Sequence, residues 1–390
     1  MLYDINGLLL ESAYNIDSSP CTYAYDINGN EVYNNQKDPY LPGRLLVFED
    51  DFDGNSINPE NWGYEVGHVR GKSYEAKWPD NAYVENGVLV VTERQETRTM
   101  YEEWPSYDYV TYQWISGGIF SRGRKQWVYG RFEAKMKLPL FFNGAFWFMG
   151  NSFRQLYVNQ DGSAPSYSTR YAGVENINNW AECGEIDCVE SWSYTQKTQP
   201  QCNLWSNTGV SISHGTFPVA LDTVDEWHVY AIEKTPTYIA AFIDDVEYKR
   251  WTYSDYSAET VAAYIDKAIS IIIGIGIGNE NDRSRGDSVN MYVDWVRVYA
   301  PEGITAPVLP ESVYIQSTYS IPVGYRTYMN PIVMPLTATD MTVTWESDDL
   351  TIVRCEYGGY LYAESVGETD IYAVTHNNKR CKCHITVTTA

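Results

Sequence analysis

The stretch GEIDCVE at residues 184–190 places three carboxylates in a segment that otherwise has the composition of a buried strand. Side chains alternate between two faces along a strand, so Glu185 and Asp187 point the same way. Glu190 lies five residues after Glu185 and would face the opposite side of a regular strand. A single β-bulge inserts one extra residue and changes this parity. The stretch therefore predicts a bulged strand with all three acids on one surface.

The three acids have the spacing of a catalytic pair with a third acid between them. Burying like charges together costs several kcal/mol unless hydrogen bonds or chemistry require it. At roughly 3.3 Å per residue, four effective steps separate the two glutamate backbones by about 13 Å, and side chains that lean inward would bring the carboxylates to about 5 Å. That separation is expected of a retaining glycosidase and is too short for an inverting one. The alternative is an acidic surface strand in an acidic protein.

The composition is that of a soluble globular protein with an excess of aromatic residues. The 390 residues allow two or three domains, and 44% are hydrophobic and 20% charged. The chain has 34 Tyr and 13 Trp, more than a core needs. Aromatic faces stack on sugar rings and also fill β-sandwich interiors, so the excess suggests a carbohydrate ligand without requiring one.

Charge and cysteine content exclude several classes of partner. A net charge of −23 argues against nucleic acid and anionic membranes, and disfavours heavily sulfated polysaccharides. No apolar run reaches the length of a membrane span, and residues 1–20 lack the pattern of a signal peptide. Seven cysteines leave at least one outside any internal disulfide, and Cys381 and Cys383 have no second pair at zinc-finger spacing. Most of the thiols are expected to be buried small hydrophobes.

The chain divides into four segments by composition. Residues 1–44 are rich in Asn, Asp, Tyr and Pro and are expected to form an extended lead-in or a small hairpin. Residues 45–300 consist of short apolar or alternating runs between turn residues, which predicts an all-β sandwich. Residues 301–310 are rich in Pro and Gly and are expected to be a linker, and residues 311–390 resume an all-β pattern as a small second domain.

Within the sandwich, several runs predict strands and one predicts a helix. The strand-like runs are Tyr83–Thr92, Gly117–Arg122, Tyr129–Leu138, Trp227–Glu233, Tyr238–Ile243 and Met291–Tyr299. The helix is expected at Ala258–Ile269, with Val261, Ala262, Ile265 and Ile269 on one face.

Two further stretches look like insertions. Tyr101–Trp114 is crowded with aromatic and acidic residues, and Asn151–Asn179 is a long polar loop that leads into the acidic strand. Long loops in compact domains are often functional. We therefore expect both stretches to form walls of a substrate cleft.

Six ordered motifs in residues 45–300 resemble glycoside hydrolase family 16, the laminarinase-like enzymes with a β-jelly-roll fold. The motifs are FEDDFDG at 48–54, NAYVENGVL at 81–89, YGRFEAKMKLP at 129–139, AFW at 145–147, Trp180 with GEIDCVE at 184–190, and VDWVRVY at 293–299. The bulged spacing of the acids is similar to the laminarinase and agarase side of the family. The resemblance implies a concanavalin-like jelly roll and a glycosidase.

The resemblance also implies a role for each acid. Glu185 would be the nucleophile that forms a covalent glycosyl-enzyme. Glu190 would protonate the leaving oxygen and then activate water. Asp187 would hydrogen-bond the nucleophile and help to keep Glu190 protonated through like-charge repulsion.

Further site residues are expected from the same family positions. Trp147 and Trp180 match positions near the cleft and would stack on sugars, or would pack in the core. Asn81 and His214 are candidate polar substrate contacts, although a structural role for His214 is an equal alternative. No cofactor is expected for catalysis. Family members often hold a structural calcium, and the matching positions lie near Asp51 and Asp294, where oxygen ligands would suit it.

Three departures from the family pattern concern the substrate. Asn143-Gly144 stands where laminarinases usually carry Trp-Pro, Ala181 replaces a proline after Trp180, and the Gly-rich run at 273–279 lacks the usual asparagine-bearing form. The expected function is an endo-acting retaining β-glycanase that hydrolyses β-1,3 or mixed β-1,3/1,4 glucan. The first alternative is a β-galactan hydrolase acting on agar or porphyran-type polymers or host O-glycans. The second is a non-catalytic glycan-binding or adhesion protein.

Residues 311–390 resemble a bacterial Ig-like domain of the type 2 group. The matching motifs are TVTWESDD at 342–349, GYLYA at 359–363 and VGET at 366–369. Such modules act mostly as spacers or adhesion units. We therefore expect an extracellular or cell-surface bacterial protein, monomeric, with a polysaccharide substrate and no membrane span, whose signal was removed or whose export follows another route.

Overall fold

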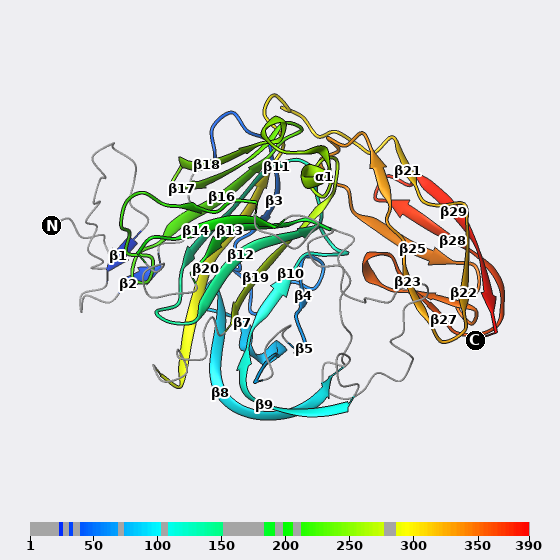
Figure 1. The fold of residues 1–390 in the computed structure, drawn as a ribbon, viewed down its shortest axis with the longest axis horizontal. Coiled ribbons are helices and arrows are strands. Elements are labelled where there is room, and N and C mark those ends of the chain that lie inside the picture. The colour runs from blue at the N-terminus through cyan, green and yellow to red at the C-terminus, as the bar shows by residue number, and fades with distance from the viewer. Residues whose placement is uncertain are drawn as a thin grey trace, which may run out of the picture. The chain divides into compact units, whose positions relative to one another are not determined.

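The protein is described from a computed structural model (Figure 1). The structure describes residues 23–25, 31–33, 40–68, 74–102, 108–150, 183–191, 198–205, 212–276 and 286–389. The chain forms two compact units, Met1–Gly43 and Arg44–Ala390. In the first unit β1 (Tyr23–Tyr25) pairs antiparallel with β2 (Glu31–Tyr33).

Two large sheets form the all-β sandwich that the sequence predicts. The seven-stranded sheet has the order β15-β14-β13-β12-β19-β10-β4. Its strands are β4 (Gly63–Tyr64), β10 (Gly118–Phe120), β12 (Asn143–Gly150), β13 (Glu185–Glu190), β14 (Gln201–Trp205), β15 (Gly215–Thr216) and β19 (Ile269–Gly276).

The eleven-stranded sheet has the order β18-β17-β16-β11-β20-β8-β9-β6-β5, with β3 on β20 and β7 on β8. Its strands are β3 (Leu46–Asp50), β5 (Gly67–His68), β6 (Glu75–Lys77), β7 (Ala82–Glu85), β8 (Val88–Glu102), β9 (Asp108–Ser116), β11 (Gly130–Lys137), β16 (His228–Lys234), β17 (Tyr238–Ile243), β18 (Val246–Thr252) and β20 (Ser288–Tyr299).

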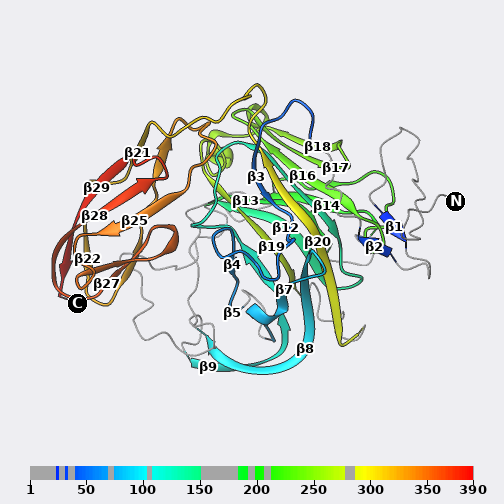
Figure 2. The ribbon, with the colours of Figure 1, turned by 180° about the vertical axis from the view of Figure 1, so that it is seen from behind.

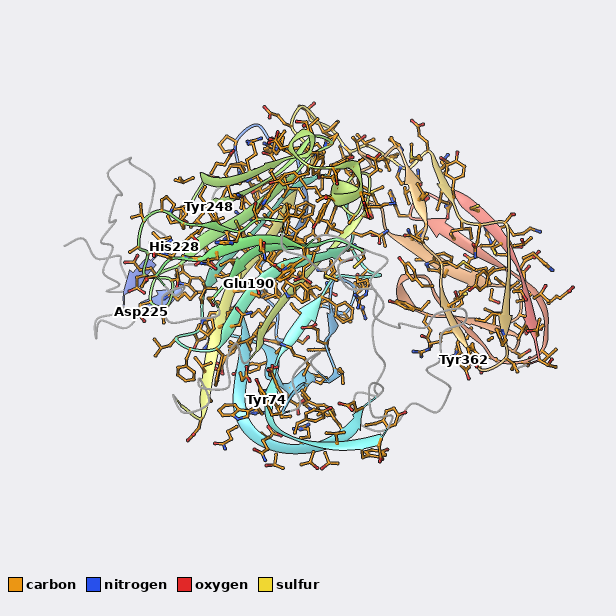
Figure 3. The ribbon with its side chains drawn as sticks, in the orientation of Figure 1. Tyr74, Glu190, Asp225, His228, Tyr248 and Tyr362 are labelled. Carbon is orange, nitrogen blue, oxygen red and sulfur yellow. The ribbon has the colours of Figure 1, made fainter. Side chains whose placement is uncertain are left out.

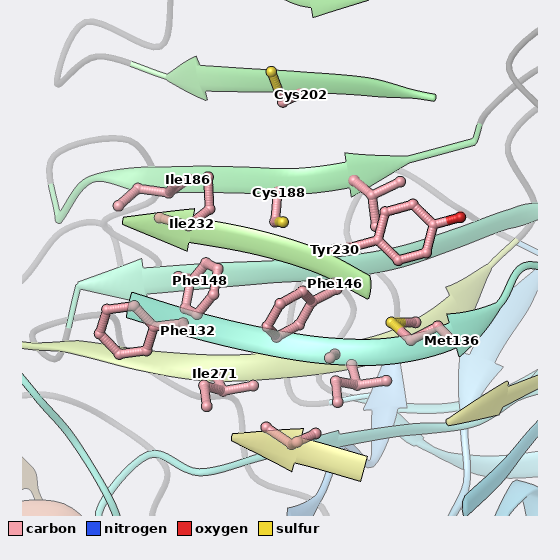
Figure 4. Close-up of a cluster of buried hydrophobic side chains, with 14 of the residues drawn as sticks. Phe132, Met136, Phe146, Phe148, Ile186, Cys188, Cys202, Tyr230, Ile232 and Ile271 are labelled. Atoms are coloured by element: carbon pink, nitrogen blue, oxygen red, sulfur yellow. The ribbon is translucent and has the colours of Figure 1, made fainter. Parts of the chain in front are cut away.

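The main core lies between these sheets. Phe146 and Phe148 alternate with Trp147 along β12, and their rings meet Phe132 of β11 and Ile186 of β13 (Figure 4). Fully burying a side chain of this size contributes about 1.5–3 kcal/mol, so this alternation fixes which face of β12 and β13 points inward. We call the opposite face of the seven-stranded sheet the outer face.

The run Tyr83–Thr92 forms a hairpin and not the single strand that its composition suggests. Strand β7 ends at Glu85 and β8 begins at Val88. The two residues between them, Asn86 and Gly87, have φ of 53° and 79°. Two consecutive left-handed residues make the tight hairpin turn that Asn-Gly favours. The expectation of one strand was wrong because it overlooked this dipeptide.

The expected helix at Ala258–Ile269 is also shorter than its pattern suggests. Helix α1 spans only Ala258–Val261, with the Ser257 side chain accepting a hydrogen bond from the Thr260 backbone N–H. Turns follow as far as Asp266, which has a left-handed φ of 55°. Ala262, placed on the apolar face by the sequence, is exposed, and Tyr264 is buried in its stead.

Of the two expected cleft walls, only part of one is described. Residues 101–102 end β8 and residues 108–114 belong to β9; these two strands curve together at the bottom of Figure 1 and are seen from behind in Figure 2. Met100 and Tyr112 of these strands pack on Ala76 and Trp78. The loop Asn151–Asn179, with Trp180 and Ala181, lies outside the described residues.

Residues 311–389 form three small sheets, in the orders β21-β24, β22-β29-β28-β25 and β23-β27-β26. The strands are β21 (Ser312–Tyr314), β22 (Thr318–Pro322), β23 (Arg326–Tyr328), β24 (Ile332–Met334), β25 (Val343–Ser347), β26 (Val353–Cys355), β27 (Tyr360–Ala363), β28 (Gly367–Thr375) and β29 (Arg380–Thr388). Their Ig-like character and the domain boundaries stay predictions. Across the described ranges, no helix is long and apolar enough to cross a membrane.

Candidate active site

The acidic strand contains the bulge that its parity requires. Trp147 of β12 lies opposite Asp187, and the next residue of β12, Phe146, lies opposite Val189. Cys188 is therefore the extra residue, and the pairing of β13 with β14 shifts in the same segment. Tyr248 Oη donates a hydrogen bond to the Cys188 carbonyl at 3.2 Å, which gives the bulged backbone a partner.

The bulge brings the three acids onto the outer face. Their partners on β12 are Met149 for Glu185, Trp147 for Asp187 and Ala145 for Glu190. These three partners are two residues apart and share a face, opposite to Phe146 and Phe148 in the core. Figure 3 labels Glu190 at the end of β13.

On the other side of β13, Cys188 and Val189 both belong to the buried core, and Figure 4 shows Cys188 among the core side chains. Two successive inward side chains are what one inserted residue produces. The local sequence thus anchors the bulge with apolar residues while the acids remain outside.

Asp187 is the most deeply placed of the three acids, with 1% of its surface exposed. Burial raises the pKa of Asp187 well above its usual range, and the neighbouring Glu190 and Glu185 raise it further. A hydrogen bond with Glu190 acts in the same direction, whereas Trp205 Nε1, which donates to Asp187 Oδ2 at 3.1 Å, lowers it. Burial and like-charge repulsion therefore favour a state in which Asp187 and Glu190 hold one proton between them.

Asn143 supports Glu190 from the adjacent strand. Its Nδ2 donates to Glu190 Oε1 at 3.3 Å, and its Oδ1 accepts a hydrogen bond from the Ser191 backbone N–H at 2.9 Å. The Ser191 hydroxyl contacts both backbone groups of Gly144, at 3.1 and 3.2 Å. The dipeptide that departs from the family pattern therefore fixes the end of β13.

Glycines allow the segment before Glu185 to pack closely. Gly184 has a φ of 80°, and a Cβ there would lie 2.7 Å from the Ala263 carbonyl oxygen. A Cβ on Gly150 would lie 1.7 Å from the Cys183 carbonyl oxygen. Side chains at these two positions would push β13 away from its neighbours and move Glu185.

The predicted substrate contacts lie in different surroundings. Trp147 is half-buried on the outer face and packs beside Phe120, Met149, Cys183 and Ile272, where it can meet a ligand above the acids. Asn81 is fully buried, and its Nδ2 donates to the Ile115 carbonyl at 2.8 Å. His214 is exposed next to β15, two strands from β13. A substrate contact by any of these side chains stays a prediction, and Trp180 lies outside the described residues.

One of the two residues proposed to bind calcium, Asp294, already has another cation nearby. Lys135 Nζ lies 3.0 Å from Asp294 Oδ2. Within the described ranges, no three side chains of His, Cys, Asp or Glu gather where they could hold a metal ion. A calcium ion at Asp51 and Asp294 remains a prediction, which the Lys135 contact does not favour.

Sequence reasoning missed Asn143 and Trp205 as supporting residues of the acids. Both lie on strands that flank β13, and each is separated from its acid partner along the chain. The departure of Asn143-Gly144 from the family pattern was a signal at one of the two positions. Trp205 had no comparable signal, because only strand pairing brings it to Asp187.

The chain is similar to proteins of known family and fold. A model of the glycosyl hydrolases family 16 matches residues 71–297. A β-glucanase from Rhodothermus marinus is 27% identical over 288 residues, which is 70% of this chain and 90% of the relative.

Two solved structures share the fold. An endo-β-1,3-glucanase from Pyrococcus furiosus has a TM-score of 0.51 at 23% identity, covering 66% of this chain and 98% of its own. A chain from work on endo-acting O-glycanases of the human gut microbiota that initiate mucin breakdown has a TM-score of 0.51 at 20% identity, covering 67% and 93%. The likeness confirms the predicted jelly-roll fold.

Proposed function

Because the chain belongs to glycosyl hydrolases family 16 and is a glycoside hydrolase, we propose that it is an endo-acting, retaining enzyme that cleaves β-1,3 or mixed β-1,3/1,4 glucan. The observation that carries this proposal is the bulge at Cys188, which places Glu185, Asp187 and Glu190 on one face of β13. The estimated separation of about 5 Å between the two glutamate carboxylates suits retention.

The proposed reaction has two displacements. Glu185 attacks the anomeric carbon and forms a glycosyl ester, while Glu190 gives its proton to the leaving glycosidic oxygen. Glu190 then takes a proton from water as the water oxygen attacks the same carbon and releases Glu185. Before the first displacement Asp187 shares the proton that Glu190 will donate, and Asn143 holds the Glu190 carboxylate in place.

The choice of a glucan is supported by the similarity to the β-glucanase from Rhodothermus marinus. The match covers 90% of that relative. A β-galactan or host O-glycan remains the second candidate, favoured by one observation. Asn143 and Gly144 occupy the place of the Trp-Pro that laminarinases usually carry, which changes the outer face beside Glu190. We set aside the non-catalytic alternative, because a glycan binder has no need for three acids on one surface.

We also propose an extracellular or cell-surface location in a bacterium. A polysaccharide is too large to enter a cell intact, so an enzyme that cleaves it internally must meet it outside. Secretion into the medium or display at the surface, measured by fractionation of the producing cells, tests this proposal.

The test of catalysis is a Glu185→Ala variant. We expect it to lose nearly all hydrolysis of laminarin and lichenan while still binding them, because the nucleophile is gone and the rest of the outer face is intact. Proton NMR of the first product should show a retained β anomer. Glu60→Ala, an exposed glutamate elsewhere, serves as the control and should be fully active. Full activity of Glu185→Ala, or an inverted product, would contradict the mechanism.

The substrate is tested separately by product sizes from laminarin, lichenan, agarose, porphyran and mucin glycans. Oligosaccharides of intermediate length from the two glucans alone would support the proposal. Release from agarose, porphyran or mucin alone would favour the second candidate.

A further inference from the structure

A row of small residues crosses the outer face from Glu190. Glu190 lies opposite Ala145 of β12, Ala145 lies opposite Gly274 of β19, and Gly274 lies opposite Gly118 of β10. Neighbouring strands are about 4.8 Å apart, so the row extends about 14 Å from the acids. Beyond Ala145 the sheet itself carries no side chain along this row.

The side chain of Glu65 lies over the far end of the row. A Cβ on Gly118 would lie 2.1 Å from Glu65 Oε2, and a Cβ on Gly274 would lie 3.2 Å from the same oxygen. The Glu65 backbone N–H donates to the Gly118 carbonyl at 2.9 Å, which fixes the residue there. The two glycines therefore make room for a carboxylate on the outer face.

Lys77 lies beside this carboxylate, and its ammonium group already donates hydrogen bonds to two backbone carbonyls. Its Nζ donates to the Gly117 carbonyl at 3.0 Å and to the Ile275 carbonyl, and a Cβ on Gly274 would lie 3.3 Å from it. The ammonium is thus held at a fixed position on the edge of the sheet. Its charge stabilises the ionised form of Glu65.

The Glu65 carboxylate is open to a hydrogen-bond donor from outside the chain. It is partly buried, and among the residues that the structure describes none donates a hydrogen bond to it. Burial raises the pKa of Glu65, while Lys77 and Arg122 lower it and Glu75 raises it. A charged acceptor that water can reach can exchange that water for a hydroxyl donor, so this carboxylate is suited to a donor that a ligand brings.

An apolar row of side chains runs alongside the row of small residues. Trp147 lies opposite Ile272, which in turn lies opposite Phe120, and the three side chains pack in one cluster. A sugar ring has an apolar face and hydroxyl groups at its edge. The two rows provide an apolar surface and a polar acceptor next to each other, which is the combination that binds sugars.

We propose that Glu65, held by Lys77, is a specificity-determining residue that accepts a hydrogen bond from a hydroxyl group of a neutral sugar, in a subsite remote from the cleaved bond. The inference rests on the proposed glycan hydrolysis and adds a second point of recognition on the same face. A chain long enough to reach from the acids across about 14 Å would make this contact, and a shorter one would not.

The test compares Glu65→Ala and Glu65→Gln with the native protein on β-1,3-gluco-oligosaccharides of increasing length. A hydrogen bond to a charged group contributes about 1.5–3 kcal/mol, so we expect the KM of long chains to rise on the order of tenfold in Glu65→Ala, with the loss confined to KM. Glu65→Gln keeps an acceptor and should lose less. Glu85→Ala, at the exposed β7–β8 turn, is the matched control and should resemble the native protein.

Calorimetric binding of the same oligosaccharides to Glu185→Ala, with and without Glu65→Ala, separates this inference from the proposed catalysis. Weaker binding that is confined to the long chains supports the subsite, even if the native protein does not hydrolyse these oligosaccharides. An unchanged affinity for every length would overturn it. So would an equal loss at every length, or a fall in kcat, since these would assign Glu65 a structural or catalytic role. Circular dichroism of both Glu65 variants checks that they fold.

Discussion

At the scale of single residues, the proposed reaction depends on a proton that Asp187 and Glu190 share. Both carboxylates lie on the outer face next to the bulge, and Asp187 is almost fully buried. Two adjacent carboxylates cannot both ionise easily, so the last proton of the pair leaves only at raised pH. This is the state that a general acid needs at the start of the reaction.

The variant Asp187→Asn tests this coupling. Removing the charge of Asp187 removes the repulsion that disfavours ionisation of Glu190, so the last proton should leave at lower pH. We expect the alkaline limb of the kcat/KM profile to move toward acid, with a lower maximum. A limb that stays in place would show that Asp187 does not control the proton of Glu190. Stopped assays of laminarin hydrolysis across the pH range provide the measurement.

Asn143 is the second residue whose role can be measured. In Asn143→Ala, Glu190 loses a donor and the Ser191 N–H loses its acceptor. A hydrogen bond to a charged group is worth about 1.5–3 kcal/mol, which corresponds to a fall in kcat on the order of tenfold or more. Asn290→Ala on β20, whose amide contacts Tyr292, is the control. Equal kinetics of the two variants would remove Asn143 from the site.

At the scale of elements, the parity of residues 184–190 predicted the bulge, because alternation along a strand is a local rule. The turn at Asn86-Gly87 could also have been predicted from these two residues, because Asn-Gly favours a tight hairpin turn. The contacts of Asn143 and Trp205 were not predictable in this way. They depend on which strands pair with β13 and in which register, and one sequence does not specify non-local pairing.

Strand β16 ends in a buried lysine, Lys234. Lys234 Nζ donates to the Val128 carbonyl at 2.6 Å and to the Lys267 carbonyl at 3.0 Å. Burial lowers the pKa of Lys234 to about 7. Its hydrogen bonds tie the end of β16 to two loops, and its charge is costly in that place.

This lysine should make stability depend on pH. Between about pH 7 and the ordinary lysine pKa of about 10.4, the unfolded state binds more protons at this residue than the folded state. The free energy of unfolding should therefore rise with pH in this window, by at most about 1.4 kcal/mol per pH unit. Urea unfolding of Lys234→Met should show a flatter dependence. An identical slope in native and variant proteins would exclude this residue as the source.

At the scale of the whole molecule, the net charge of −23 acts on any charged substrate. The field of the protein repels anionic polymers before they reach the acids, and salt shortens its range from about 10 Å at 0.1 M to about 3 Å at 1 M. A neutral glycan is not subject to this effect.

We therefore expect chemically sulfated laminarin to be hydrolysed more slowly than laminarin at low salt, with the ratio of rates approaching one as sodium chloride is added. Initial rates at several ionic strengths measure the ratio. A ratio that does not change with salt would assign the discrimination to local fit and not to the overall charge.

The bulge has a consequence for how the length of the acidic strand can vary. Deleting Cys188 or Val189 would leave Glu-x-Asp-x-Glu, in which strict alternation again places all three acids on one face. Deleting Ile186 would turn Glu185 alone to the other face. A single-residue insertion or deletion therefore keeps the three acids on one face only when it falls between Asp187 and Glu190. In the evolution of such a strand, gain or loss of the bulge would keep the three acids together, whereas a length change before Asp187 would separate them.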